Sequence, residues 1–399
     1  MRTDSDVRMR TGRGSSGHTQ GMSLPLRDVY AEPTLADLLP SVLASAGVAG
    51  EMNRLGLAEC SRTVVLLVDG MGWELLQRNK KAAPFLTSAP GHSIRAGFPT
   101  TTAVSLASLG TGLPSGRHGI TGYQSYVDEI EAPVNWLRWT LAGTAIDKRD
   151  ELVPEKVQPH PTVFERGSVA GIAVTTVVPK HFEGSGLTRA VLRGGAFVGV
   201  SAYGDLLARV VSAIGADERS LVYCYLGEVD TLGHVYGPES DAWLAQLTIV
   251  DRFVEQLAAA LPRDARLLVT ADHGMVDASR GRRVDFDHTP GLGEEVSVIA
   301  GEPRCRHVYT GSVDTVLERW RNELGDDMWV GTRDDVLAAG LFGPEPTPSL
   351  VGRIGDIVAI GRGESSVIRT DGERVMSELP GQHGALTDDE LFVPLLRLQ

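Results

Sequence analysis

The chain has 399 residues, 42% of them hydrophobic and 22% charged, which is typical of a globular protein with a sizeable core. Its formal net charge of −13 at pH 7 argues against a general nucleic-acid-binding surface, because such a surface needs a basic stripe. An acidic, solubilising surface explains most of this excess, and acids gathered around bound dications would explain the rest.

Targeting and cysteine signals are weak. Cys60, Cys224 and Cys305 are too few and too scattered for a disulfide framework or a thiolate metal site. Residues 1–25 are polar and rich in glycine and arginine, without the apolar core of a secretory signal, so we expect a disordered tail, with Met22 as an alternative start. No stretch approaches the length of a transmembrane helix. The predicted location is therefore the cytoplasm, with no membrane as a partner.

Apolar runs that lead to acidic residues recur along the chain, at 63–68, 221–226 and 266–270. Such runs are typical of strands buried on both faces of a mostly parallel sheet. Helical patterns accompany them at 35–49, 103–110, 204–214 and 241–260. The alternation predicts an α/β fold, a three-layer α/β/α sandwich with a mostly parallel central sheet.

The acids that follow these runs are expected at one edge of the sheet. Asp69, Asp230 and Asp272 each lie just beyond a predicted strand. In such sheets, ligands bind outside the carboxyl ends of the strands. Three strand ends that carry acids together predict a binding site more strongly than any one of them.

The segment 276–370 has a different texture. Strand-like pieces at 296–301, 305–310 and 353–363 surround a helical pattern at 313–324 and a proline-rich linker. We interpret this segment as a small α+β cap inserted before the histidine-containing segment near residue 383.

Two pairs of residues combine a carboxylate with an imidazole, which are suitable ligands for Zn²⁺. Asp230 and His234 are four residues apart and converge if the segment is a helical turn. Asp272 and His273 converge only where a strand ends and the chain turns, a freedom that Gly274 supplies. An N-capping aspartate with a surface histidine remains the alternative for the first pair, and either pair alone is weak evidence.

Two further candidates are single residues. Asp69 ends the first predicted strand, but it could equally cap a helix at 74–79. His383 has a glycine on either side within two residues, which allows close backbone approach and an exposed imidazole. A solvated loop histidine is the alternative for His383.

A candidate nucleophile lies in 97–112, where three threonines precede small residues, a helical apolar pattern and a Gly-Thr-Gly stop. A hydroxyl in the first turn of that helix meets the positive end of the dipole and free backbone N–H groups. Those donors suit a phosphate or sulfate oxygen. Spacing alone also allows one of Thr100, Thr101 and Thr102 to be only an N-cap, and the two roles do not exclude each other.

Together these segments resemble the alkaline phosphatase superfamily, and more closely its nucleotide pyrophosphatase/phosphodiesterase branch. The matching stretches appear in the family's order between residues 64 and 384: VVLLVDGMG, FPTTTAVSLASLGTGLPSGRHGITGY, GEVDTLGHVYGP, TADHGM and GQHGA. The resemblance implies an alkaline phosphatase-like catalytic domain over 26–399, with the cap inserted at about 276–370.

The resemblance also implies two divalent metal ions. One would be held by Asp230, His234 and His383. The other would be held by Asp69, Asp272 and His273, with the nucleophile oxygen reaching it. We expect Zn²⁺ from the mixed nitrogen and oxygen ligands, with Mn²⁺ as the alternative.

The family's nucleophile lies nine residues before the threonine of the Thr-Gly pair that ends the helix, and counting back from Thr111 gives Thr102. The resemblance therefore implies that Thr102 attacks phosphorus and forms a phospho-threonine intermediate. The expected substrate is a small phosphate diester, a pyrophosphate or a nucleotide.

One position departs from the family pattern. Diesterase relatives place an asparagine where this chain has Tyr123, and a phenol donates one hydrogen bond where an amide donates two. Tyr123 is predicted to contact the phosphoryl group or to line the substrate pocket. Tyr126, Trp136 and Trp139 could stack on a base, although core packing is the commoner role of such aromatic residues.

Other functions remain open. No arginine matches the phosphate clamp of the phosphomonoesterase branch, which favours a diester or pyrophosphate, yet a phosphomonoesterase or a phosphonate hydrolase remains an alternative. A phosphomutase relative would carry serine as nucleophile and a much larger insertion. A non-catalytic metal-binding or phosphate-binding protein is the alternative from another class, and the full set of seven polar residues argues against it.

Overall fold

The computed structural model describes residue 26 and residues 28–398, so the tail predicted at 1–25 lies outside the described residues. Within them, the largest sheet has seven strands in the order β2-β18-β9-β1-β8-β6-β7. All strands in this sheet run parallel except β18, which is antiparallel to both of its neighbours. The strands are β1 (Arg62–Val68), β2 (Gly91–Arg95), β6 (Ala173–Pro179), β7 (Ala196–Val200), β8 (Ser220–Leu226), β9 (Ala265–Thr270) and β18 (Phe392–Leu398). The predicted mostly parallel sheet is confirmed.

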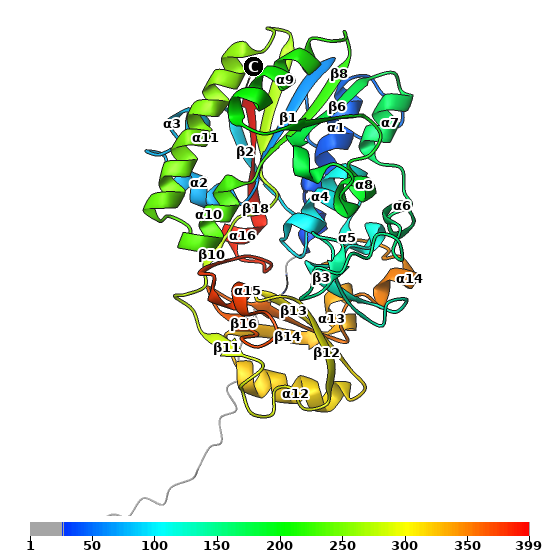
Figure 1. The fold of residues 1–399 in the computed structure, drawn as a ribbon, viewed down its shortest axis with the longest axis vertical. Coiled ribbons are helices and arrows are strands. Elements are labelled where there is room, and N and C mark those ends of the chain that lie inside the picture. Colours follow the sequence, from blue (N-terminus) through cyan, green and yellow to red (C-terminus); the bar gives the residue numbers. More distant parts are fainter. Residues whose placement is uncertain (1–25, 27, 399) are drawn as a thin grey trace, which may run out of the picture.

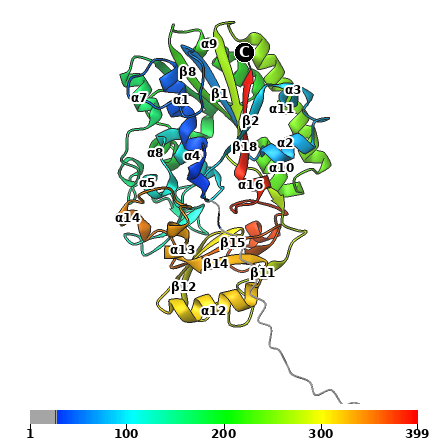
Figure 2. The same cartoon turned by 180° about the vertical axis from the view of Figure 1, so that it is seen from behind.

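Helices cover both faces of this sheet (Figures 1 and 2). One group packs together on one face and consists of α1 (Leu38–Ser45), α4 (Thr102–Thr111) and α7 (Val163–Val169). The other group consists of α9 (Tyr203–Ile214), α10 (Glu228–Tyr236) and α11 (Asp241–Ala260). All residues of β9 are buried because both faces of the strand are covered. The predicted three-layer α/β/α sandwich is confirmed.

The predicted helices at 103–110, 204–214 and 241–260 correspond to α4, α9 and α11. The helix expected at 35–49 is shorter, because it begins as a 3-10 turn, η2 (Leu35–Asp37), and α1 ends at Ser45. Gly47 then adopts a φ of +79°, a left-handed conformation that stops a helix. None of the helices between residues 28 and 398 is long and apolar enough to cross a membrane.

A separate antiparallel sheet, here called the small sheet, forms from the segment predicted as the cap (lower part of Figure 1). Its strand order is β12 (Val296–Glu302), β13 (Cys305–Thr310), β15 (Ile357–Gly361) and β14 (Met328–Thr332). Helix α12 (Val313–Leu324) packs against it and buries Trp320 in an apolar cluster apart from the main core. The strands expected at 296–301 and 305–310 and the helix expected at 313–324 are present, and the strand expected at 353–363 is limited to β15.

The turns that follow β1 and β9 touch each other through two glycines. A methyl group on Gly274 would lie 1.9 Å from the carbonyl oxygen of Asp389 and 2.8 Å from the Cα of Gly72. The two turns therefore meet at backbone distance, which a side chain at either position would prevent. This close approach brings the ends of the two strands, and the acids that follow them, together.

We predict that Gly274→Ala lowers the free energy of unfolding by about 1–3 kcal/mol, because the added methyl group would overpack a backbone contact. The matched control is Gly204→Ala in α9, where nothing lies within 4 Å of the added methyl group. Alanine favours a helix by about 1 kcal/mol over glycine, so the control is expected to be unchanged or slightly stabilised. Urea unfolding followed by tryptophan fluorescence measures both. Equal stability of the two variants would contradict the close contact.

Candidate active site

The seven predicted residues come from separate parts of the chain and meet at the carboxyl edge of the main sheet. Asp69 follows β1, Asp230 and His234 lie on α10 after β8, and Asp272 and His273 follow β9. Thr102 is the first residue of α4, and His383 follows the short strand β17 (Gly381–Gln382). Asp272 and His273 are fully buried, and Asp69 is 2% exposed.

One cluster forms around His273. Its Nε2 lies 3.5 Å from Asp69 Oδ1 and 3.3 Å from Asp272 Oδ2. The Thr102 hydroxyl lies 3.1 Å from the same nitrogen. Asp69, Asp272 and His273 are thus close enough to hold a metal ion together, with the Thr102 oxygen beside them.

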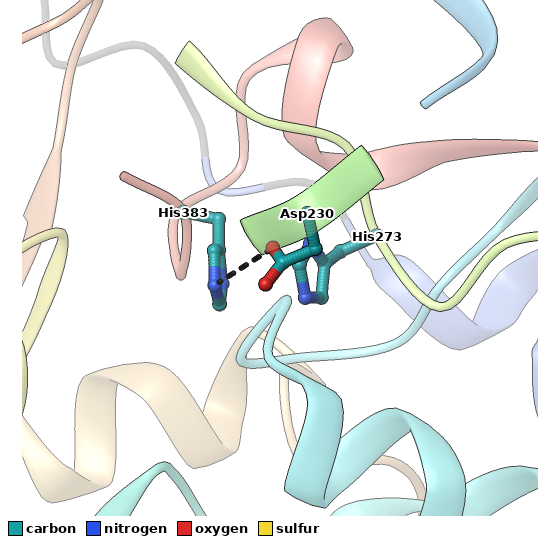
Figure 3. Close-up of side chains that lie close together, drawn as sticks. All are labelled: Asp230, His273 and His383. Carbon is teal, nitrogen blue, oxygen red and sulfur yellow. Dashed lines mark ion pairs between the residues drawn. The ribbon is translucent and has the colours of Figure 1, made fainter. Parts of the chain in front are cut away.

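A second cluster forms around Asp230. Its Oδ1 lies 3.4 Å from His234 Nε2 and 4.0 Å from His383 Nε2, and the two nitrogens are 3.2 Å apart. Figure 3 shows Asp230 between His383 and His273, a trio that also satisfies metal-binding distances. The rings of His273 and His383 stack with centroids 3.7 Å apart, so the two clusters adjoin.

The backbone sets the tautomer of all three histidines. His234 Nδ1 lies 2.8 Å from Gly381 O, His273 Nδ1 lies 3.0 Å from Gly274 O, and His383 Nδ1 lies 2.9 Å from Thr100 O. A carbonyl oxygen only accepts, so each Nδ1 carries the hydrogen and donates it. Each Nε2 therefore faces the cluster, and in a neutral imidazole held this way Nε2 carries the lone pair that a metal ligand needs.

The carboxylates fit a cation. Asp69 Oδ1, Asp230 Oδ1 and Asp272 Oδ2 are buried without a hydrogen-bond partner among the described residues. Such oxygens are costly in a folded protein unless an ion or water satisfies them. Burial, followed by the charges of Asp272 and Asp230, raises the pKa of Asp69 well above its usual value. Burial and the neighbouring His273 and His234 lower the pKa of His383, which keeps its imidazole neutral.

The structure also separates the alternatives for individual residues. Helix α2 (Trp73–Arg78) has Gly72 as its N-cap, so Asp69 does not cap it. Asp230 lies in the first turn of α10, whose N-cap is Gly227. Both aspartates therefore lack the capping role that sequence spacing allowed.

The three threonines have different partners. Thr100 donates its hydroxyl hydrogen to Ala385 O at 2.8 Å. Thr101 is the N-cap of α4, but its side chain makes no capping hydrogen bond there. The Thr102 hydroxyl faces His273 instead. Thr102 is thus the one of the three whose hydroxyl contacts a residue of the clusters, whereas Thr100 reaches His383 through its backbone carbonyl.

The aromatic residues after α4 divide into two groups. Trp136 and Trp139 are fully buried and pack edge to face, with centroids 5.1 Å apart, which agrees with core packing. Tyr123 is half-buried; burial raises the pKa of its phenol, and the Asn135 side chain lowers it.

Two sets of contacts at the site were not predicted from the sequence. Tyr225 donates a hydrogen bond to Asp69 Oδ2, and Thr100 holds both His383 and Ala385. The face on which Tyr225 lies could be predicted from the strand pattern. Tyr225 is two residues after Tyr223 on β8, so both side chains lie on the same face of the strand. The role of Thr100 depends on contacts more than 280 residues away in sequence, which local patterns do not reveal.

A cavity of about 40 Å³ adjoins Thr102 and is mostly apolar, with Leu137, Phe182, Leu187 and Tyr225 in its wall. Leu187 belongs to α8 (Gly186–Val191), which packs on α4 so closely that a methyl group on Gly110 would lie 2.0 Å from Val191 O.

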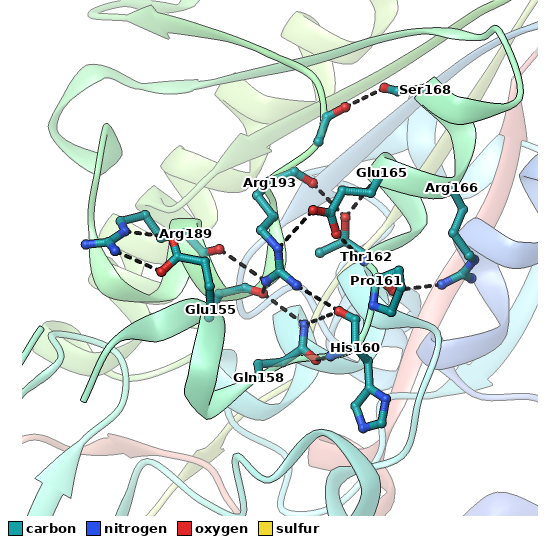
Figure 4. Close-up of polar contacts among 12 residues, drawn as sticks. Glu155, Gln158, His160, Pro161, Thr162, Glu165, Arg166, Ser168, Arg189 and Arg193 are labelled. Carbon is teal, nitrogen blue, oxygen red and sulfur yellow. Dashed lines mark hydrogen bonds and ion pairs between the residues drawn. The ribbon is translucent and has the colours of Figure 1, made fainter.

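Ion pairs connect α8 and the residues that follow it to neighbouring segments of the chain. Arg189 of α8 pairs with Glu155 at 2.8 Å, and Arg193 pairs with Glu165 of α7 at 3.1 Å (Figure 4). The Arg193 guanidinium also donates to His160 O at 2.8 Å. These contacts join α8 and the segment after it to neighbouring parts of the chain, although the Arg189–Glu155 pair is exposed and so contributes little stability.

We predict that Asp69→Asn stabilises the metal-free protein at pH 8 and reduces its stabilisation by metal. A raised pKa means that the folded state binds this proton more tightly than the unfolded chain, so stability falls as the pH rises from about 4 through the raised pKa. Asp69→Asn has no carboxyl group at this position, so the variant does not lose stability in this way as the pH rises. Thermal unfolding with a chelator, at pH 4 and pH 8, should therefore show the gain only at pH 8.

The control for this experiment is Asp251→Asn. Asp251 is also buried, but it accepts hydrogen bonds from Phe85 N and Leu86 N, away from the cluster. Its variant should keep the rise in Tm that added Zn²⁺ produces in the wild type. A full Zn²⁺-induced rise in Asp69→Asn would contradict the assignment of Asp69 as a ligand.

Known proteins resemble parts of this chain in sequence. Human ectonucleotide pyrophosphatase/phosphodiesterase family member 7 is 38% identical over 81 residues, which are 18% of this chain and 18% of that protein. The 2,3-bisphosphoglycerate-independent phosphoglycerate mutase of Yersinia pestis (strain Pestoides F) is 33% identical over 130 residues, 31% of this chain and 25% of the mutase. The chain thus matches a quarter or less of the length of these relatives.

Solved structures share the fold over most of the chain. Murine ectonucleotide pyrophosphatase/phosphodiesterase 5 superposes with a TM-score of 0.65 at 17% identity, covering 84% of this chain and 87% of the murine one. An inactive threonine-to-alanine variant of it, in complex with AMP, gives a TM-score of 0.66. The sequence profile described as type I phosphodiesterase / nucleotide pyrophosphatase matches residues 63–386. The chain therefore belongs to the type I phosphodiesterase/nucleotide pyrophosphatase family.

Proposed function

We propose that this protein hydrolyses phosphodiester or phosphoanhydride bonds, using two divalent cations and Thr102 as the nucleophile. The observation that carries the proposal is the Thr102 hydroxyl, which lies 3.1 Å from His273 where the two clusters of carboxylates and imidazoles adjoin. Family membership supports the reaction class.

Asp69, Asp272 and His273 would hold one cation, and Asp230, His234 and His383 the other. When bound, such cations lower the pKa of the nucleophile and of water and neutralise charge on the phosphoryl group. The mixed oxygen and nitrogen donors favour Zn²⁺, with Mn²⁺ as the alternative. The partnerless carboxylate oxygens support this occupancy.

The residues of the chain would position the nucleophile and orient the phosphoryl group of the substrate. The Thr102 hydroxyl gives up its proton as its oxygen attacks phosphorus. The bond to the leaving oxygen breaks, that oxygen takes up a proton, and a phospho-threonine forms. Water then attacks that phosphorus, the bond to Thr102 breaks, and a proton returns to the threonine. Backbone N–H groups at the start of α4 face the phosphoryl oxygens. We assign Tyr123 a contact with the substrate.

The substrate is proposed to carry a nucleoside or another apolar group. Two observations support this: the apolar cavity beside Thr102, and the AMP bound by the murine structural neighbour. The cavity of about 40 Å³ admits only the edge of a base, so the base would rest against Leu137 and Phe182. A phosphomonoesterase or a phosphonate hydrolase remains the alternative within the same chemistry.

We predict that Thr102→Ala lowers kcat for bis(p-nitrophenyl) phosphate by on the order of a thousandfold or more, because the nucleophile is lost. Thr102→Ser should retain measurable activity, since it keeps an attacking oxygen. Metal content, measured in parallel, should stay close to that of the wild type if the remaining six ligands suffice. Full activity of Thr102→Ala would refute the assignment.

The apolar wall makes a separate prediction. Leu137 is 39% exposed, so Leu137→Asn should fold normally. It should raise KM for thymidine 5′-(p-nitrophenyl phosphate) about tenfold, from the roughly 1–1.5 kcal/mol of apolar contact that it removes. Methyl p-nitrophenyl phosphate, which lacks the nucleoside, should show no change in KM.

The matched control for the wall is Ile249→Asn, another exposed aliphatic residue, which lies on α11 outside the cavity. This variant should leave KM for both esters unchanged. If Leu137→Asn raises KM for both esters equally, the wall does not recognise the nucleoside.

A further inference from the structure

We propose that Arg304, at the tip of the β12–β13 hairpin, is a positioning residue of the active site. It acts through Glu390, which fixes the loop that carries His383, and this loop in turn fixes the residues just before Thr102. Through these contacts, the segment proposed as a cap would fix the position of His383 relative to Thr102. The inference rests on the proposed function, because it assigns Arg304 a role in that same site.

The first link is an ion pair between the small sheet and the main domain. Arg304 Nε and Nη2 donate to the two oxygens of Glu390 at 3.0 and 2.7 Å, and neither side chain is exposed. Glu390 lies on the short helix α16 (Asp388–Leu391), which leads into β18. Two parallel hydrogen bonds to a planar guanidinium fix the orientation of the carboxylate as well as its position.

The second link runs from Glu390 to the metal-site loops. Its carboxylate also accepts hydrogen bonds from Ala385 N at 3.0 Å and from the Thr387 hydroxyl at 2.6 Å. Its backbone carbonyl accepts from Gly274 N at 3.0 Å, directly after His273. One residue thus holds the loop after His383 and the turn after His273.

The third link joins the His383 loop to the nucleophile segment. Thr100 donates its hydroxyl hydrogen to Ala385 O at 2.8 Å and accepts one from Gly384 N at 3.1 Å. Its carbonyl accepts from His383 Nδ1 at 2.9 Å. Thr100 is two residues before Thr102, so a shift of the loop would move a ligand and the nucleophile together.

Glu302, on the same hairpin, contacts the loop that carries His383. A methyl group on Gly384 would lie 2.7 Å from its Cγ and 3.2 Å from its Oε1, so the hairpin packs directly on the His383 loop. Burial raises the pKa of its carboxyl to about 8, despite the opposing effects of the Thr101 side chain, the Arg306 charge and the Tyr123 backbone. The hairpin therefore touches the start of α4 as well as the loop.

The ion pair is better explained by orientation than by stability. Taking both charges out of water costs about as much free energy as their attraction returns, so a buried pair is weak evidence of stabilisation. The pair instead fixes the Glu390 carboxylate, which lies where the loop after His383 meets the turn after His273.

The test compares Arg304→Lys with Arg306→Lys. Lysine keeps the charge but cannot make two parallel hydrogen bonds. Arg306 is on the same hairpin, is equally buried, and binds the two oxygens of Glu373 at 3.2 and 2.7 Å. Glu373 precedes α15 (Arg374–Glu378) and, among the described residues, makes no hydrogen bond to the loop that carries His383, so Arg306→Lys is the matched control for that link.

Four quantities are measured for each protein: Tm, the dissociation constant for Zn²⁺ in competition with a chromophoric chelator, and kcat and KM at saturating metal. We expect Arg304→Lys to weaken Zn²⁺ binding about tenfold and to lower kcat about tenfold, with KM unchanged. Arg306→Lys should change Tm as much as Arg304→Lys does, but should leave Zn²⁺ affinity and kcat unchanged. Thr387→Val, which removes a hydrogen bond to Glu390, should shift Zn²⁺ binding in the same direction and serves if Arg304→Lys does not fold.

Unchanged Zn²⁺ affinity in Arg304→Lys, or equal loss in the two lysine variants, would overturn the inference. Failure of the wild type to hydrolyse any phosphate ester would instead overturn the proposed function. The two failures are distinguishable because the Zn²⁺ measurement does not require turnover.

Discussion

The structure is organised around buried negative charge at one edge of a parallel sheet. Asp69 and Asp272 are almost completely buried, Asp230 lies nearby, and one oxygen of each has no hydrogen-bond partner among the described residues. A protein tolerates such an arrangement only if something positive enters it or the carboxyls take up protons. The histidines whose Nε2 atoms face these acids, the threonine hydroxyl and the glycine turns are all consistent with the first outcome.

Much of this arrangement was predictable from the sequence. Strands such as β1 consist of aliphatic and β-branched residues, so both their existence and their burial follow from composition, and parallel strands place their following residues at a common edge. Helix α11 shows its helical spacing throughout, and its predicted range is unchanged in the structure. The position of Asp69, Asp230 and Asp272 at one edge follows from these elements.

Long-range hydrogen bonds were not predictable. The backbone carbonyls that orient His234 and His383 are 147 and 283 residues away, and nothing local identifies them. The Arg304–Glu390 pair joins residues 86 positions apart, and each of them alone is indistinguishable from a surface charge. The ligand roles, the metal, the cap boundary and the cytoplasmic location remain predictions.

The antiparallel strand β18 has a consequence for the order in which the molecule forms. It lies between β2 and β9, inside the sheet, although it is made after every other strand. The parallel strands β1, β6, β7, β8 and β9 can associate as soon as residue 270 has been synthesised, but β2 has no neighbour until residues 392–398 arrive. Such distant pairings form late because closing a long loop costs entropy. Until β18 is synthesised, β9 is therefore an edge strand with unpaired backbone groups on one side.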